Sequence, residues 1–415
     1  MSAPTDPRAG YPAVGGPITT GGDSAGAVAA TDGARARRGR QADADTPRRI
    51  PDVVADDERR YALTRAWPRG RDHALAELTA GDGTTVAAQW FADPDALAAV
   101  AAEAPTPARV VGDMLLQPAG ADARLRALPE VLAERGAGLV AHRPGRRAVV
   151  RVADDQGANV EFVKVVRASR GTDLARRGGL VASLVGDDVP VPRLRDGSEP
   201  ERGVLRWSVV PGRTLHDLGA AEEWSVEEAR TAWIAAGRAV ARLHAAPAAL
   251  VTARHRATDE LDALAAWLHP AVSHGLLDAD LVARAGEQVT AELETGDAPS
   301  ALGVLHRDLH DKQLLLDAGA VGIIDVDTLA VGERALDVAN LLVHLELRQA
   351  QGLLTDERAA AAREGFRSGV GADELPDARL AAYVRATRLR LAGVYAFRPR
   401  WRSVARDFLR RAAVG

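Results

Sequence analysis

The segment His306-Arg-Asp-Leu-His-Asp-Lys-Gln313 is the densest polar stretch of the chain, and it lies between short apolar runs. Val304-Leu305 precedes it, Leu314-Leu-Leu316 follows it, and Ile323-Ile-Asp-Val-Asp327 comes next. Short apolar runs separated by polar turns predict strands rather than helices. Charged and amide side chains at the ends of buried strands add little to stability, so this pattern indicates a functional site.

Three interpretations of this segment compete. In the first, the site transfers a phosphoryl group from ATP, and Asp308 acts on an acceptor hydroxyl as a base or orienting group. Gln313 and Asp325 offer the oxygen atoms that Mg²⁺ prefers. The reaction also needs a cation for the nucleotide phosphates, which Lys164 in an upstream strand supplies.

The second interpretation is a metal-dependent phosphohydrolase. Its transition-metal ligands would be His306, Asp308, His310 and Asp311. This interpretation gives Lys164 no task. In the third, the polar residues only cap turns and satisfy backbone groups, which does not explain why acids and an amide alternate with apolar strands.

Lysine is rare in this chain, and its positions are informative. Of 53 lysine and arginine residues, only Lys164 and Lys312 are lysines. Codon bias explains the rarity but not the positions. Lys164 lies within the apolar strand Phe162–Val166, where a charge is costly without a partner anion. Lys312 lies on the polar segment itself, and either contact with substrate or γ-phosphate or a solvated position is open for it.

Composition and periodicity divide the chain into segments. Residues 1–58 contain almost no large apolar residue, which predicts a disordered tail. Residues 59–136 form a globular N-terminal unit whose role the residues do not reveal. Strands are expected over 73–78, 84–91, 113–117, 147–152 and 160–166, the last two joined by the turn Asp154-Asp-Gln-Gly157. Helices are expected over 123–135, 172–185, 337–350, 356–368 and 378–412.

Composition also excludes several classes of protein. The 415 residues include no cysteine, so disulfides, thiolate metal sites and cysteine nucleophiles are ruled out. The formal net charge of -4 gives no reason to expect nucleic acid or an anionic membrane as a partner. With neither a membrane-spanning run nor a signal-peptide pattern, a soluble cytoplasmic protein is expected. The oligomeric state is not evident from the sequence.

The polar segments resemble motifs of the aminoglycoside phosphotransferase family, which shares the protein-kinase-like fold. The matching residues are His306-Arg-Asp308 with Gln313, Ile324-Asp325, Asp337-Val-Ala339, Phe162-Val-Lys164, Val210-Pro-Gly212 and Arg242-Leu-His244. The likeness covers about residues 137–415. It implies an α+β, two-lobed fold with a small lobe over 137–212 and a helical large lobe over 213–415. Residues 59–136 would then form an N-terminal cap unit.

The resemblance implies an ATP- and Mg²⁺-dependent kinase acting on a hydroxyl of a small molecule. Asp308 would be the catalytic residue, and Lys164 would meet the α- and β-phosphates. Gln313 and Asp325 would hold Mg²⁺, and a second metal contact is open for Asp327. His306 and Asp337 are expected to support the loop and the following helix rather than to react.

Two departures from the family pattern carry information. Most members have Asn where Gln313 stands, and Gln there resembles the maltokinase-like bacterial branch, as does the extra N-terminal unit. The helix after Lys164 contains no glutamate between Arg167 and Asp188, so Asp173 is the only early acid that could pair with this lysine. A nucleotide-binding pseudokinase that acts as a regulator therefore remains an alternative.

Arginines near the C-terminus bear on the acceptor. They stand at positions 379, 385, 388, 390, 398, 400, 402, 406, 410 and 411, against one acid, Asp407. A site for a polycationic aminoglycoside should instead gather carboxylates. The pattern favours a neutral, singly charged or anionic acceptor such as a sugar or amino sugar, with an aminoglycoside as the alternative.

Overall fold

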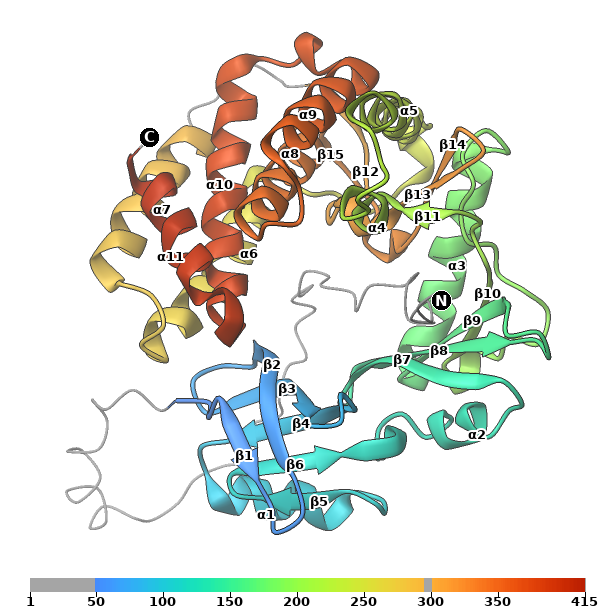
Figure 1. The fold of residues 1–415 in the computed structure, drawn as a ribbon, viewed down its shortest axis with the longest axis vertical. Coiled ribbons are helices and arrows are strands. Elements are labelled where there is room, and N and C mark those ends of the chain that lie inside the picture. Colours follow the sequence, from blue (N-terminus) through green and yellow to red (C-terminus); the bar gives the residue numbers. More distant parts are fainter. Residues whose placement is uncertain (1–48, 295–300, 415) are drawn as a thin grey trace.

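The computed structural model describes residues 49–294 and 301–414. A helical body lies above two separate sheets, one blue to cyan and one green (Figure 1). Of the expected tail, residues 1–48 lie outside the described residues. The expected boundary at residue 58 is wrong, because Val53–Ala55 form strand β1 and Ile50 is buried. Asp52 also accepts two hydrogen bonds of 2.6 Å from Arg402.

The first sheet has the strand order β1-β2-β3-β4-β6-β5 and is antiparallel throughout. Its further strands are β2 (Arg60–Pro68), β3 (His73–Ala80), β4 (Thr85–Phe91), β5 (Arg109–Val111) and β6 (Met114–Gln117). Helix α1 (Pro94–Glu103) precedes β5. The helix expected over 123–135 shortens to α2 (Leu128–Leu132), because the Asp122 carboxylate accepts backbone hydrogen bonds from Arg124 and Leu125 and holds a turn there.

The second sheet has the order β10-β9-β8-β7. Its strands are β7 (Ala137–Arg143), β8 (Arg147–Ala153), β9 (Asn159–Val166) and β10 (Val204–Ser208). The expected turn at Asp154–Gly157 joins β8 to β9, and Gly157 adopts a φ of +83° there. Helix α3 (Ala168–Val185) lies close to β10, because Gly178 leaves room for the Trp207 ring.

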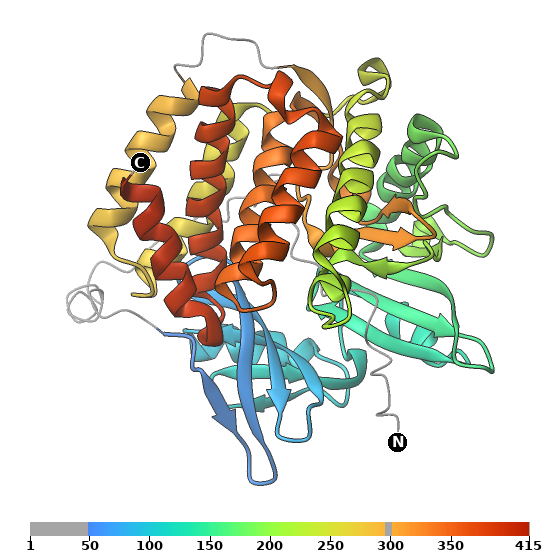
Figure 2. The same ribbon diagram turned by 45° about the horizontal axis from the view of Figure 1, so that its top comes forward.

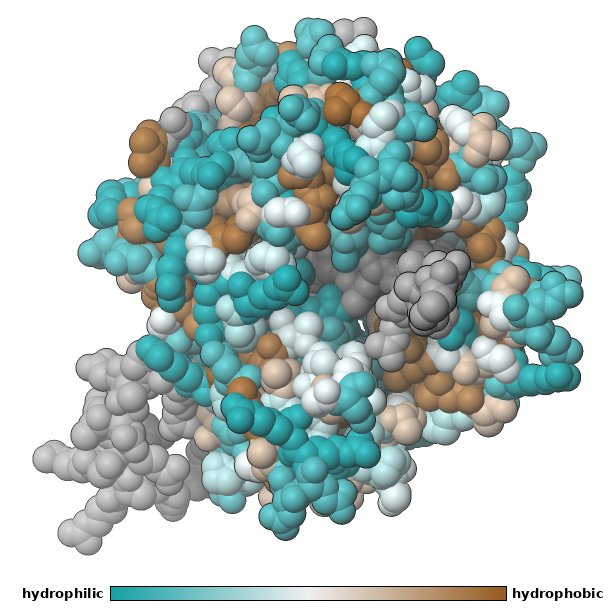
Figure 3. All heavy atoms as spheres, in the orientation of Figure 1, coloured by the Kyte–Doolittle hydropathy of each residue, from teal (hydrophilic) through white to brown (hydrophobic). Residues whose placement is uncertain are grey.

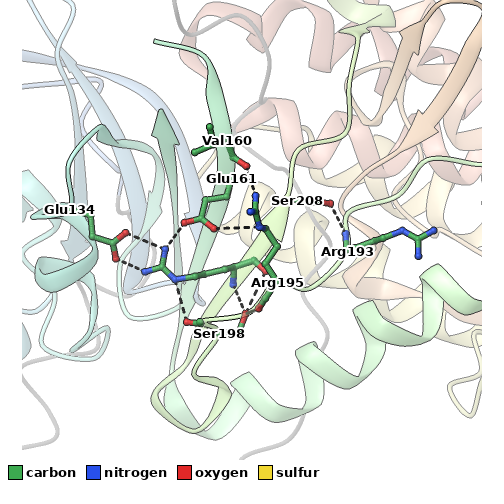
Figure 4. A network of polar contacts seen from close by, with 9 residues as sticks. Glu134, Val160, Glu161, Arg193, Arg195, Ser198 and Ser208 are labelled. Atoms are coloured by element: carbon green, nitrogen blue, oxygen red, sulfur yellow. Dashed lines mark hydrogen bonds and ion pairs between the residues drawn. The ribbon is translucent and has the colours of Figure 1, made fainter. Parts of the chain in front are cut away.

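A network of ion pairs ties the segment after α2 to the second sheet (Figure 4). Arg206 of β10 pairs with Glu134 and donates to Glu161 Oε1 at 2.5 Å. Arg195 donates to the carbonyl of Val160 at 2.8 Å. These contacts link the connection between the two sheets to the outer edge of the second sheet.

The remaining residues form mainly helices (Figure 2). They are α4 (Leu215–Gly219), α5 (Val226–His244), α6 (Ala257–Ser273), α7 (Ala279–Glu294), α8 (Ala335–Ala350), α9 (Asp356–Val370), α10 (Asp377–Ala396) and α11 (Arg402–Val414). Short strands sit among them: β11 (Arg213–Thr214), β12 (Leu302–Leu305), β13 (Leu314–Asp317), β14 (Ala320–Ile323) and β15 (Ala330–Glu333). The single helix expected over 378–412 is divided, because Pro399 cannot continue α10.

The face shown in Figure 3 is mostly hydrophilic, and its apolar residues are scattered between polar ones. Within residues 49–294 and 301–414, no helix combines the length and apolar character needed to cross a bilayer.

Candidate active site

Asp337 fixes the shape of the loop that follows β12. Its carboxylate accepts hydrogen bonds of 2.7 Å from the backbone amides of His306 and Arg307, and His244 Nε2 lies 3.1 Å away. These contacts hold Arg307 at a φ of +72°, a conformation that is unfavourable for a residue with a side chain. Since Asp308 follows directly, the strained loop sets its position. This matches the supporting role expected for Asp337.

Asp308 is buried and incompletely hydrogen-bonded. Its side-chain atom Oδ2 has no hydrogen-bond partner in the described part of the chain, and the residue is 5% exposed. Burial raises the pKa of Asp308 to about 7; the Arg390 guanidinium opposes this increase and the Asp325 carboxylate adds to it. The residue lines a cavity of about 530 Å³. A carboxylate that changes protonation near neutral pH is suited to act as a general base.

Lys164 of β9 meets two acids that follow β14. Its Nζ lies 3.4 Å from Asp325 Oδ1 and also contacts Asp327. Burial raises the pKa of Asp325, but Lys164 and Arg147 outweigh this effect and lower it to about 2. Asp325 is therefore ionised at neutral pH, and it adopts a left-handed φ of +61°.

The acidic partner of Lys164 comes from the segment after β14 and not from helix α3. Asp327 contacts Lys164, whereas Asp173 instead pairs with Arg176 and Arg177. Arg177 of α3 donates to the backbone carbonyl of Asp327 at 3.3 Å. The lysine thus keeps an acidic partner, so the missing helix glutamate is not by itself a sign of an inactive enzyme.

Gln313 is next to Asp325 in space. The Ile324 amide donates to the Gln313 backbone carbonyl at 3.0 Å, and the side-chain Oε1 accepts from the His310 amide at 3.1 Å. Its Nε2 has no partner among the described residues. An ionised carboxylate beside an amide oxygen with a free lone pair fits a hard cation such as Mg²⁺.

The ligands of the metal-phosphohydrolase interpretation are not brought together. Within the described ranges, no group of three or more His, Cys, Asp or Glu side chains is arranged to hold a metal ion. His306 Nε2 lies 2.9 Å from the Ile324 carbonyl, which supports the loop as expected. Asp311 accepts two hydrogen bonds from Arg348, at 2.8 and 2.9 Å, and lies 2.7 Å from His216 Nδ1.

The first sheet forms one wall of the cavity beside Asp308. Leu63, Thr64, Arg65 and Trp67 of β2 and Glu77 of β3 line it. Helix α10 and the loop over residues 306–313 form other parts of the wall, including Tyr395 and Lys312. The Ala66 amide donates to the Phe397 carbonyl at 2.9 Å, which joins β2 to the end of α10. No pattern in residues 59–136 predicted that they line this cavity.

Most of the C-terminal arginines do not face the cavity. Arg379, Arg385, Arg388, Arg390, Arg402, Arg410 and Arg411 pair with acids, six of them with acids on other elements. The count of ten arginines against one acid therefore overstated the positive charge available to an acceptor. Arg390, Arg398 and Arg400 do line the cavity, as does Lys312.

These features define an enzyme with a two-lobed, kinase-like fold. A model of the phosphotransferase enzyme family matches residues 138–379, so the chain belongs to this family. The expected family, fold class and enzyme class, a small-molecule kinase, are confirmed. The first sheet lies outside the matched residues.

Individual relatives are distant. Streptomycin 3''-kinase from Streptomyces griseus is 28% identical over 243 residues, which cover 53% of this chain and 85% of that protein. The structure of aminoglycoside phosphotransferase APH(3'')-Id from Streptomyces rimosus is 24% identical and covers 65% of this chain and 98% of its own, with a TM-score of 0.47. For amicoumacin kinase hAmiN the identity is 15%, the coverage 69% and 92%, and the TM-score 0.49.

Proposed function

We propose that this protein transfers the γ-phosphoryl group of ATP to a hydroxyl of a small molecule, a sugar or amino sugar. The observation that carries the proposal is Asp308, a buried carboxylate with an unpartnered oxygen at the wall of the cavity. Its pKa of about 7 lets it accept a proton from the acceptor hydroxyl at neutral pH.

Residues that do not line this cavity suit the phosphate donor. Lys164 would bind the nucleotide phosphates, since it is a compact cation held between Asp325 and Asp327. Asp325 and Gln313 would hold Mg²⁺, which when bound neutralises charge on the phosphates. Lys164 and Asp325 come from different lobes, so closure of the lobes would bring donor and acceptor together.

The direct test is ADP release measured with a panel of sugars and amino sugars. Asp308→Asn should lower kcat by at least about 100-fold, because it removes the base. Asp317→Asn, at the exposed end of β13, is the matched control and should be neutral. If nucleotide binds but no acceptor supports turnover, the pseudokinase alternative replaces the proposal.

A second candidate is phosphorylation of an aminoglycoside. It is favoured by the 28% identity to streptomycin 3''-kinase. The cations that line the cavity, Lys312, Arg398 and Arg400, oppose a polycationic acceptor. Measuring ADP release with streptomycin and kanamycin decides between a sugar and an aminoglycoside as the acceptor. Efficient turnover of either drug would overturn the sugar proposal.

A further inference from the structure

The cavity beside Asp308 carries an excess of positive charge. Its lining cations are Arg65, Lys312, Arg348, Arg390, Arg398 and Arg400, and its lining acids are Glu77 and Asp308. Three of the cations are neutralised by nearby acids: Arg65 by Glu77, Arg348 by Asp311 and Arg390 by Glu260. For Lys312, Arg398 and Arg400, no carboxylate of the described chain lies within ion-pair distance.

Two of the cations that line the cavity, Arg348 and Arg398, contact Tyr395. The Arg398 guanidinium lies 4.0 Å from the centre of the Tyr395 ring, and Arg348 donates to its hydroxyl at 3.5 Å. Burial raises the pKa of Tyr395, but Arg398, Arg348 and Lys312 together lower it below its ordinary value. The three cations thus act together on one part of the cavity wall.

A neutral hydrogen-bonding group without a partner lines the same cavity. His344 is 6% exposed, and its Nδ1 has no hydrogen-bond partner among the described residues. Burial holds its pKa well below the ordinary value, so the ring is neutral. Buried polar groups are normally satisfied, and one left open beside a cavity points to a polar ligand.

We propose that the acceptor carries an anionic group, a carboxylate or a phosphate, and that Lys312 and Arg398 bind it while its hydroxyl meets Asp308. Partly buried cations without a counter-charge are costly, and a ligand anion offsets that cost. The guanidinium of Arg398 can donate two parallel hydrogen bonds to either kind of anion. This inference rests on the proposed function and specifies the chemistry of its acceptor.

The volume of the cavity agrees with such a ligand. About 530 Å³ is within the range of pockets that enclose small molecules, so a sugar acid or sugar phosphate fits. Trp67, Trp401 and Tyr395 line the cavity as well and offer aromatic faces to a sugar ring. A polycation there would meet Lys312 and Arg398 at short range.

The test uses four ligands that share one sugar ring and differ in charge. Glucosamine, glucose, glucuronate and glucose 6-phosphate are titrated calorimetrically into the full chain, and ADP release is measured with each. We expect glucuronate or glucose 6-phosphate to bind at least about tenfold more tightly than glucose, as one charge-assisted contact provides. The two anions distinguish a carboxylate site from a phosphate site.

Variants locate the bound anion. Arg398→Gln and Lys312→Gln should each remove the preference for the anion, and Arg398→Lys should restore part of it. Arg410→Gln, on α11 away from the cavity, is the matched control and should keep it. In calorimetry without nucleotide, Lys164→Gln should also keep the preference, which would show that the anion does not occupy the nucleotide site.

The outcomes separate the two proposals. Turnover of a neutral sugar without any preference for anions would overturn the inference and leave the proposed function standing. Tight binding of an anion, lost in Arg398→Gln, with no turnover of any acceptor would support the anion site and overturn the proposed function. A preference for glucosamine over glucuronate would also overturn the inference.

Discussion

The Lys164 ammonium lies between the carboxylates of Asp325 and Asp327, so one ion-pair cluster joins strand β9 to the segment after β14. Lys164 is 12% exposed and the two acids are 9% and 18% exposed, so water screens these contacts only weakly. Nucleotide phosphates that reach Lys164 would share it with these two acids. Phosphate binding by Lys164, as proposed, would therefore depend on the relative position of β9 and the segment after β14.

Lys164→Arg should lower the phosphotransferase activity. Arginine keeps the charge but replaces a compact ammonium with a longer planar group that does not fit between two acids. We expect kcat/KM for ATP to fall by at least about 100-fold. The control is Arg410→Lys on the surface, which should leave the rate unchanged. Equal rates in both variants would contradict the role given to Lys164.

Asp308→Asn should stabilise the protein in a pH-dependent way. The folded-state pKa of Asp308 is about 7 and its ordinary value is 3.8, so the folded chain binds the extra proton between these limits. The free energy of unfolding that protonated Asp308 contributes is therefore present at low pH and is lost as the pH rises through 7. Asparagine carries no charge, so its advantage in melting temperature should be small at pH 5 and large at pH 8.

Thermal unfolding at these two pH values checks the prediction. Asp317→Asn, an exposed site, should show no such difference between pH 5 and pH 8. The wild-type kcat/KM should decrease about tenfold per pH unit below the pKa of Asp308, because protonation removes the base. An advantage of Asp308→Asn that is equal at both pH values would argue against a raised pKa in the folded protein.

The buried pair of Asp311 and Arg348 should tolerate joint removal better than single removal. Both side chains are almost fully buried, at 2% and 6% exposure. Arg348→Met leaves an uncompensated buried carboxylate and should cost about 3–5 kcal/mol of the free energy of unfolding. Adding Asp311→Leu should recover part of that loss. Additive losses measured by denaturant unfolding would show that the two groups are not coupled.

The sequence predicted those elements that are stabilised by contacts between residues close together in the chain. The turn at Asp154–Gly157 forms as expected, since the Asp154 carboxylate accepts from the amides of Gln156 and Ala158. The loop over residues 306–313 and the segment around Asp325 also lie next to each other, as the family resemblance implied. The roles of Asp308, Lys164, Gln313 and Asp325 stay predictions until the variants are measured.

Features that depend on distant partners were not predictable. The acid beside Lys164 comes from 163 positions away, so no helix pattern after Lys164 reveals it. Arg379 appeared as free charge in the sequence, whereas Glu333 neutralises it across the fold. The cavity wall built by β2 likewise depends on how the first sheet meets α10. Hydrophobic periodicity carries no information on such contacts.

Gly178 on α3 provides the last prediction, with its neighbour as control. A Cβ at Gly178 would lie 2.1 Å from the Trp207 ring, whereas a Cβ at exposed Gly179 meets nothing within 4 Å. Gly178→Ala should cost about 1–3 kcal/mol by overpacking, and Gly179→Ala should add about 1 kcal/mol through helix propensity. Since Arg177 reaches the Asp327 carbonyl from the same helix, Gly178→Ala should also raise KM for ATP. Denaturant unfolding and ADP release measure both effects, and equal stability of the two variants would refute the close packing of α3 on β10.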